Sequence, residues 1–120
     1  WVGALTPASA VDVRLGQIVT ATLASPFGKG YYIGSRTASN QLRLYKDGQL
    51  AASSSAGVTH TKPATGVFLF AFSNAGAASA FLPGRGSFYS IGQGLNETEA
   101  AALNRAVRTL QVNLARENTL

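Results

Sequence analysis

Cysteine is absent from this chain, so disulfide bonds and thiolate metal sites are excluded. Histidine occurs once, at His60, and a metal site built on imidazole would therefore lack partner ligands. The chain also lacks the D-x-D spacing of oxygen ligands that is typical of calcium-binding loops. We therefore predict that the chain holds no metal and uses no cofactor.

Acidic residues are scarce, and the five in the chain are Asp12, Asp47, Glu97, Glu99 and Glu117. Asp47 falls in a predicted turn. Glu97 and Glu99 fall in a predicted first helical turn, where they favour the positive end of the helix dipole. Glycoside hydrolysis generally needs two carboxylates about 5–9 Å apart, and no predicted strand carries such a pair.

Nucleophilic catalysis would have to use His60 together with one of the serines at 53–55 and a distant acid. The loop around His60 has no G-x-S-x-G elbow, and a solvated loop histidine explains it better. We predict no catalytic residues and no enzyme activity in this chain.

Charged residues make up only 12% of the chain, with a net charge of +5. The basic residues are spread along the sequence, whereas nucleic-acid-binding proteins usually cluster them. No apolar run approaches the roughly 20 residues of a membrane-spanning helix. The sequence therefore predicts neither a nucleic-acid partner nor a membrane span.

Short alternating segments separated by glycine, proline, serine and asparagine dominate the first three quarters of the chain. This pattern predicts about seven short antiparallel strands in a sandwich or barrel. They are expected at residues 11–15, 18–23, 31–37, the hairpin 41–53, 67–72 and 87–92. The run 67–72 is the most apolar and is predicted to be a central strand buried on both faces. The segments 53–66 and 73–86 are expected to be loops.

The hairpin has the clearest turn signal. Asp47-Gly48 is favoured in a type I′ turn, which needs positive φ at both central residues. Before the turn, Leu42 and Leu44 are predicted to point to one face of the sheet, and Arg43 and Tyr45 to the other.

The last quarter of the chain predicts a helix. Asn96 with Glu99 three residues later forms a capping-box pattern, and Leu95 can pack as the preceding apolar residue. An apolar stripe follows at Leu103, Val107, Leu110 and Leu114, with arginines on the opposite side.

The predicted organisation is all-β with a C-terminal helix in three parts. Residues 1–10 form an N-terminal tail or strand remnant. Residues 11–94 form an antiparallel β-sandwich portion, and residues 95–117 form an amphipathic helix packed on that sandwich. The Gly92-Gln93-Gly94 segment is interpreted as a tight strand-to-helix turn and not as a phosphate-binding loop.

Tyrosines beside arginines provide the candidate ligand-binding surface. Exposed tyrosines can stack on sugar rings or anchor a protein interface. The residues predicted to be presented are Tyr32, Arg36, Arg43 and Tyr45.

Three motifs carry a resemblance to a known family. They are Gly30 with Ser35-Arg36-Thr37 and Asn40, the Y-K-D-G hairpin at 45–48, and S-I-G-x-G-L at 90–95 followed by an alanine-rich helix. Together they make about residues 11–117 similar to the C-terminal portion of concanavalin A-like lectin/glucanase (LamG-like) jelly-roll domains, of the type found in phage tail and other virion proteins.

The resemblance implies an antiparallel jelly-roll β-sandwich that is incomplete in this chain. Complete domains of the family have further strands upstream. The resemblance therefore implies that the missing strands come from a preceding segment of the same polypeptide or from another chain.

The resemblance also implies a non-enzymatic structural and binding module on the tail or another exterior part of a phage virion. Other virion subunits in an oligomeric assembly, and a host glycan, are the expected partners. Two alternatives stay open. One is a bacterial secreted or cell-surface carbohydrate-binding module. The other is a fragment of a glycoside hydrolase whose acids lie outside this chain, since the acidic strand motif of laminarinase-type glucanases is not present.

Overall fold

The computed structural model describes the backbone in seven stretches and the side chains in fewer. The backbone stretches are residues 2–6, 10–14, 20–23, 29–57, 72–74, 77–79 and 86–116. Side chains are described for residues 29–57, 77–78 and 86–116. The loop that carries His60 and residues 67–71 of the predicted central strand lie outside these stretches.

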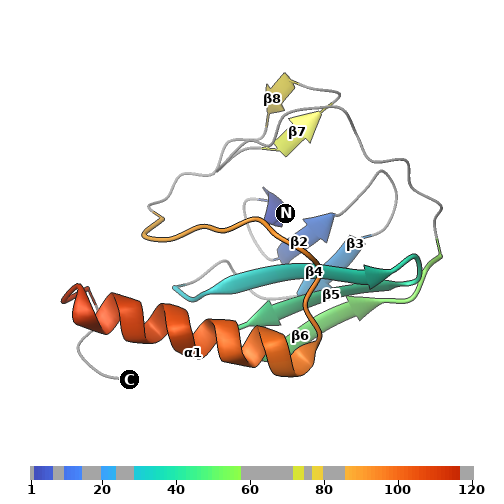
Figure 1. Cartoon of the computed structure of the whole chain (residues 1–120). Coiled ribbons are helices and arrows are strands. Elements are labelled where there is room, and N and C mark those ends of the chain that lie inside the picture. The colour runs from blue at the N-terminus through green and yellow to red at the C-terminus, as the bar shows by residue number, and fades with distance from the viewer. Residues whose placement is uncertain are drawn as a thin grey trace.

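The first sheet is antiparallel, with order β1-β2-β3 (Figure 1). It consists of β1 (Val2–Thr6), β2 (Ala10–Arg14) and β3 (Thr20–Leu23). Strands expected at 11–15 and 18–23 are confirmed at 11–14 and 20–23, and residues 15, 18 and 19 lie outside the described stretches. Within the first ten residues, β1 pairs with β2 and so belongs to the sheet.

The second sheet is antiparallel, with order β4-β5-β6, and β5 lies in its centre. Its strands are β4 (Tyr32–Ala38), β5 (Gln41–Lys46) and β6 (Gln49–Ser54). The turn between β5 and β6 has φ of 52° at Asp47 and 82° at Gly48, as a type I′ turn requires. Tyr31 holds this turn from the start of β4. Its backbone N–H donates to Asp47 Oδ1 at 2.9 Å, and its carbonyl accepts from the Asp47 N–H at 2.9 Å.

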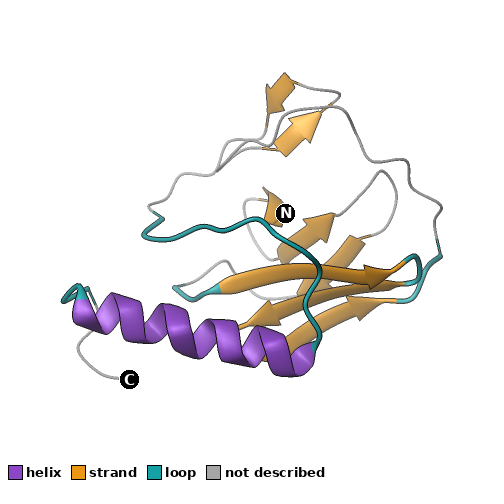
Figure 2. Ribbon diagram, viewed as in Figure 1, coloured by secondary structure: helices purple, strands orange, loops and turns teal. Residues whose placement is uncertain are grey.

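Two local predictions are wrong. The expected loop at 73–86 contains a short hairpin made of β7 (Phe72–Asn74) and β8 (Ala77–Ser79). The strand expected at 87–92 does not form, and residues 86–96 instead cross the edge of the second sheet as an extended segment (Figure 2). This crossing segment does not extend the ladder of β4, because Leu95 exchanges its hydrogen bonds with the Ser35 side chain, as described below.

The single helix of the described residues, α1 (Glu97–Asn113), begins as predicted. Asn96 Oδ1 accepts from the Glu99 N–H at 3.0 Å, and the Asn96 N–H donates to Glu99 Oε2 at 2.8 Å. Both halves of the capping box are present, so the predicted helix start is confirmed.

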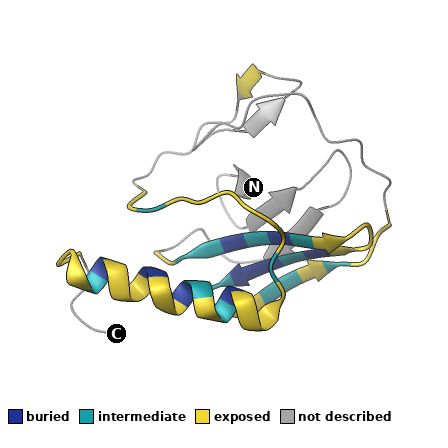
Figure 3. Ribbon diagram, viewed as in Figure 1, coloured by how far each residue is buried: buried dark blue, intermediate teal, exposed yellow. Residues whose placement is uncertain are grey.

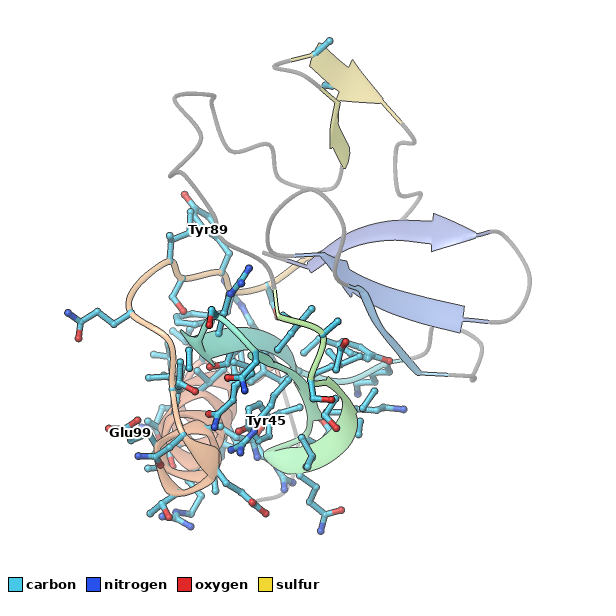
Figure 4. The ribbon with its side chains drawn as sticks, turned by 90° about the vertical axis from the view of Figure 1, so that its right-hand side faces the viewer. Tyr45, Tyr89 and Glu99 are labelled. Carbon is cyan, nitrogen blue, oxygen red and sulfur yellow. The ribbon has the colours of Figure 1, made fainter. Side chains whose placement is uncertain are left out.

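The second sheet lies between α1 and the first sheet (Figures 1 and 4). Ile33 and Tyr45 pack against Ala100 of α1, with Leu103 beside them. On the other face of β5, Leu42 is 2% exposed and Leu44 is fully buried, where β3 runs against β5 and β6. Both faces of β5 are therefore covered, and the core of the described residues is centred on this strand.

The buried face of α1 differs from the predicted apolar stripe. It consists of Ala100, Asn104, Val107 and Gln111 (Figure 3). Leu110 and Leu114 are 41% and 49% exposed. The helix is rotated because Asn104 is held by the β5–β6 turn, where its Nδ2 donates to the Asp47 carbonyl at 3.0 Å.

Candidate functional site

The four predicted site residues lie on two opposite faces of the second sheet. Directly opposed residues of neighbouring antiparallel strands point to the same face. Tyr32 pairs with Lys46 and Arg36 with Leu42, which places them on the face turned away from α1. Arg43 and Tyr45 pair with Ser35 and Ile33 and share the face covered by α1. The four side chains therefore do not form one surface.

The prediction that Tyr45 is presented to a ligand is wrong. Its side chain is fully buried against Ile33 and Ala100, between the second sheet and α1 (Figure 4). The alternation along the hairpin was predicted correctly, with Arg43 and Tyr45 opposite Leu42 and Leu44. Alternation assigns a face, but it does not say that a helix covers that face.

Tyr32 and Arg36 make local contacts. The Lys46 ammonium lies 5.7 Å from the centre of the Tyr32 ring, a cation–π distance. Arg36 holds the β4–β5 turn, where its Nη2 donates to the Ser39 carbonyl at 2.7 Å and its Nε to the Ala38 carbonyl at 3.3 Å. These hydrogen bonds give Arg36 a structural role in the turn, so its presence there does not require a ligand.

Arg43 is the predicted residue that faces an opening. A solvent-open hollow of about 210 Å³ lies at the ends of β5 and β6, next to the β4–β5 turn. It is lined by Asn40, Gln41, Leu42, Arg43, Ser53, Ser54 and Ser55. We take this polar hollow as the candidate functional site.

The Arg43 residue is partly exposed, and its guanidinium stays charged. Its Nη1 donates to the Tyr45 hydroxyl at 3.5 Å, a long hydrogen bond. This hydrogen bond, followed by the Coulombic interaction with the same hydroxyl, raises the pKa of Arg43 above its ordinary value. Glu97, in the first turn of α1, raises it further. A cation therefore lines the polar hollow throughout the physiological pH range.

A bulge in β6 brings serine next to this cation. Tyr45 pairs with Leu50, but Leu44 pairs with Ala52, so Ala51 is the extra residue. Beyond the bulge the register places Ser53 opposite Arg43. Without the bulge, the turn at 47–48 would place Ala52 there.

From the sequence, the serines at 53–55 were weighed only as nucleophiles, and Asn40 and Gln41 were not predicted to contact a ligand. A sequence signal for them does exist. The Asn-Gln pair and the serine run stand at the two ends of the predicted hairpin, and a hairpin brings its ends together.

The crossing segment fixes the start of α1 on the opposite edge of the sheet. The buried Ser35 hydroxyl donates to the Leu95 carbonyl at 2.6 Å and accepts from the Leu95 N–H at 2.7 Å. Next to Leu95, Gly94 lies so close to the Arg36 carbonyl that a Cβ would overlap it. The start of the helix, with Glu97, is thereby held on the face of Arg43.

The crossing segment also carries the most exposed large apolar side chains of the described residues. Tyr89 is 68% exposed and Ile91 is 72% exposed. Figure 4 shows Tyr89 at the surface, well away from Tyr45. Tyr89 was not among the four predicted site residues.

Neither a metal cluster nor a membrane-spanning helix is found among the residues that the structure describes. No three histidine or acidic side chains in these stretches gather in a way that could hold a metal ion. The described helix is too short and too polar to cross a bilayer.

Comparisons of the chain with protein-family models, with curated proteins and with solved structures find no match. The resemblance to LamG-like domains therefore stays a hypothesis that rests on the motifs in the sequence.

Proposed function

We propose that this chain is a non-enzymatic structural and binding module of a phage virion, with a LamG-like jelly-roll fold, and that it contacts a host glycan. The polar hollow is the observation that supports the binding role. A guanidinium, two amides and three hydroxyls line one opening, and such side chains hydrogen-bond to sugar hydroxyls. The motifs at 30–40, 45–48 and 90–95 support the virion setting.

The antiparallel sheets and the C-terminal helix are compatible with the proposed fold. The packing of β3 against β5 and β6 on the face of Leu42 and Leu44 is also the sheet-on-sheet contact that a sandwich needs. In this proposal the second sheet supplies a rigid base, and the β4–β5 turn with the end of β6 presents the ligand contacts.

The crossing segment is the proposed contact with a neighbouring virion subunit. Tyr89 and Ile91 expose most of their side chains, and aromatic anchors are enriched at protein interfaces. This surface lies apart from the polar hollow, so the chain could bind a glycan and a subunit at the same time.

Titration of the 15N-labelled chain with neutral and acidic oligosaccharides tests the binding role. We expect amide shifts at Asn40–Arg43 and Ser53–Ser55, and none along the exposed side of α1. If no oligosaccharide shifts these amides at millimolar concentration, the glycan contact is wrong. Tail or capsid genes beside the gene for this chain would support the virion setting, and genes of a secretion or cell-wall locus would contradict it.

A further inference from the structure

The polar hollow has many hydrogen-bond donors, and the described residues that line it include no carboxylate. Arg43 contributes a planar guanidinium that only donates, and Nη1 alone has a partner within the described residues. Among the described residues no carboxylate forms an ion pair with the guanidinium, and Glu97 acts on it through its electric field alone. The strongest charge at the hollow is therefore available to a ligand.

Gln41 adds a further donor. Its Oε1 accepts a hydrogen bond from Thr37 Oγ1 at 2.8 Å. With the oxygen engaged, the amide NH2 group is the part of the side chain left to contact a ligand. The serine hydroxyls can donate or accept, so the lining favours a ligand group that is rich in acceptors.

The size of the hollow limits the ligand. A volume of about 210 Å³ is below the roughly 300–1,000 Å³ of sites that enclose drug-sized molecules. It suits one sugar residue at the end or in the middle of a glycan that otherwise lies in solvent. The net charge of +5 also favours the approach of an anionic glycan.

We propose that the polar hollow recognises the carboxylate of an acidic sugar residue, such as a hexuronate. The Arg43 guanidinium binds the carboxylate oxygens in the two-pronged geometry that arginine forms with carboxylates. Gln41 and the serines at 53–55 bind the ring hydroxyls. This inference rests on the proposed glycan contact and names its chemical class.

A matched pair of oligosaccharides tests whether the ligand is an acidic sugar. The full chain is titrated with a glucuronate-containing tetrasaccharide, and with the same tetrasaccharide after reduction of its carboxyl groups to alcohols. We expect the reduced form to bind about tenfold more weakly, since a charge-assisted hydrogen bond contributes roughly a factor of ten to affinity. The readout is the set of amide shifts at Asn40–Arg43 and Ser53–Ser55.

Matched variants place the effect at the hollow. Arg43→Gln should weaken binding of the acidic tetrasaccharide about tenfold. Arg105→Gln removes the same charge from the exposed side of α1 and should leave affinity unchanged. Ser55→Asp, which adds a carboxylate to the rim, should weaken binding as well, whereas Ser90→Asp outside the hollow should not. Because Ser55 is exposed, this variant tests the inference without disturbing the Arg43–Tyr45 contact.

The outcomes separate the two proposals. Equal binding of the acidic and reduced sugars, with shifts at the hollow, overturns the acidic class and leaves the glycan contact intact. If Arg43→Gln and Arg105→Gln lose affinity for the acidic tetrasaccharide equally, the binding is a general attraction to a basic surface. That result also overturns recognition of an acidic sugar at the hollow. If neither tetrasaccharide binds while another oligosaccharide shifts the hollow amides, the acidic class is wrong and the glycan contact stands. If no oligosaccharide shifts them, both proposals are wrong.

Discussion

At the scale of single residues, Gly94 shows how closely the crossing segment approaches β4. An added Cβ would overlap the Arg36 carbonyl oxygen and lie 2.6 Å from its carbonyl carbon. Both are backbone atoms and cannot rotate away. Gly92, two residues earlier, has nothing within 4 Å of the same position.

We therefore predict that Gly94→Ala lowers the free energy of unfolding by about 1–3 kcal/mol, the usual cost of overpacking. Gly92→Ala is the control and should be neutral or stabilising by about 0.4–1 kcal/mol, because alanine restricts the unfolded chain. Urea unfolding of both variants measures the difference. Equal stability of the two would mean that the segment does not pass over β4 as described.

Two buried amides on the same face of α1 have opposite surroundings. Asn104 donates to the Asp47 carbonyl, although within the described part of the chain its Oδ1 has no partner. Gln111 is equally buried at 6% exposure, and neither atom of its amide has a hydrogen-bond partner among the described residues. Burial without a partner costs free energy, so these amides should respond differently to the same substitution.

Gln111→Leu should raise the free energy of unfolding by about 1–3 kcal/mol, because it removes an unpaired buried amide. Asn104→Leu should lower it by about 1–3 kcal/mol, because it leaves the Asp47 carbonyl without its donor. Thermal and urea unfolding report both changes. A destabilised Gln111→Leu chain would show that this amide has a partner in solution.

At the scale of elements, α1 depends on its first turn. The capping box at Asn96 and Glu99 satisfies backbone N–H groups that have no partner inside the helix. Asn96→Ala is expected to cost about 0.5–2 kcal/mol of stability. Asn113→Ala, at the exposed last residue of the helix, is the control and should change stability by less than about 0.5 kcal/mol. Circular dichroism at 222 nm during urea unfolding follows both, and equal losses would argue against the cap.

The β5–β6 hairpin shows which features of an element local sequence determines. Asp47-Gly48 predicted the turn and its positive φ angles, because few residues adopt that conformation. The bulge at Ala51 was not predicted, since an alanine in a run of small residues carries no signal for it. That single extra residue decides whether Ala52 or Ser53 lies beside Arg43.

At the scale of the whole molecule, β5 is covered by α1 on one face and by the first sheet on the other. Leu44 is fully buried on the face toward the first sheet, whereas Leu50 of β6 is 44% exposed. The stability of the layers should therefore depend strongly on Leu44 and weakly on Leu50.

Leu44→Ala should lower the free energy of unfolding by about 2–5 kcal/mol, the range for a large-to-small change in a packed core. Leu50→Ala should cost about 1 kcal/mol or less, since much of that side chain stays in water. Urea midpoints and slopes of the two variants provide the comparison. A small effect at Leu44 would contradict the packing of the two sheets.

The sequence by itself determined the antiparallel strands β2 to β6, the type I′ turn between β5 and β6, and the capped start of the helix. These features depend on alternation and on residues within a few positions of each other. Tertiary structure alone decided that Tyr45 is buried, that α1 turns Asn104 and Gln111 inward, and that residues 86–96 cross the sheet edge. It also decided which side chains meet at the polar hollow. Such features depend on contacts between segments about 50–60 residues apart, such as Ser35 with Leu95 and Asp47 with Asn104. Local propensity carries no information about which distant surface will cover a face.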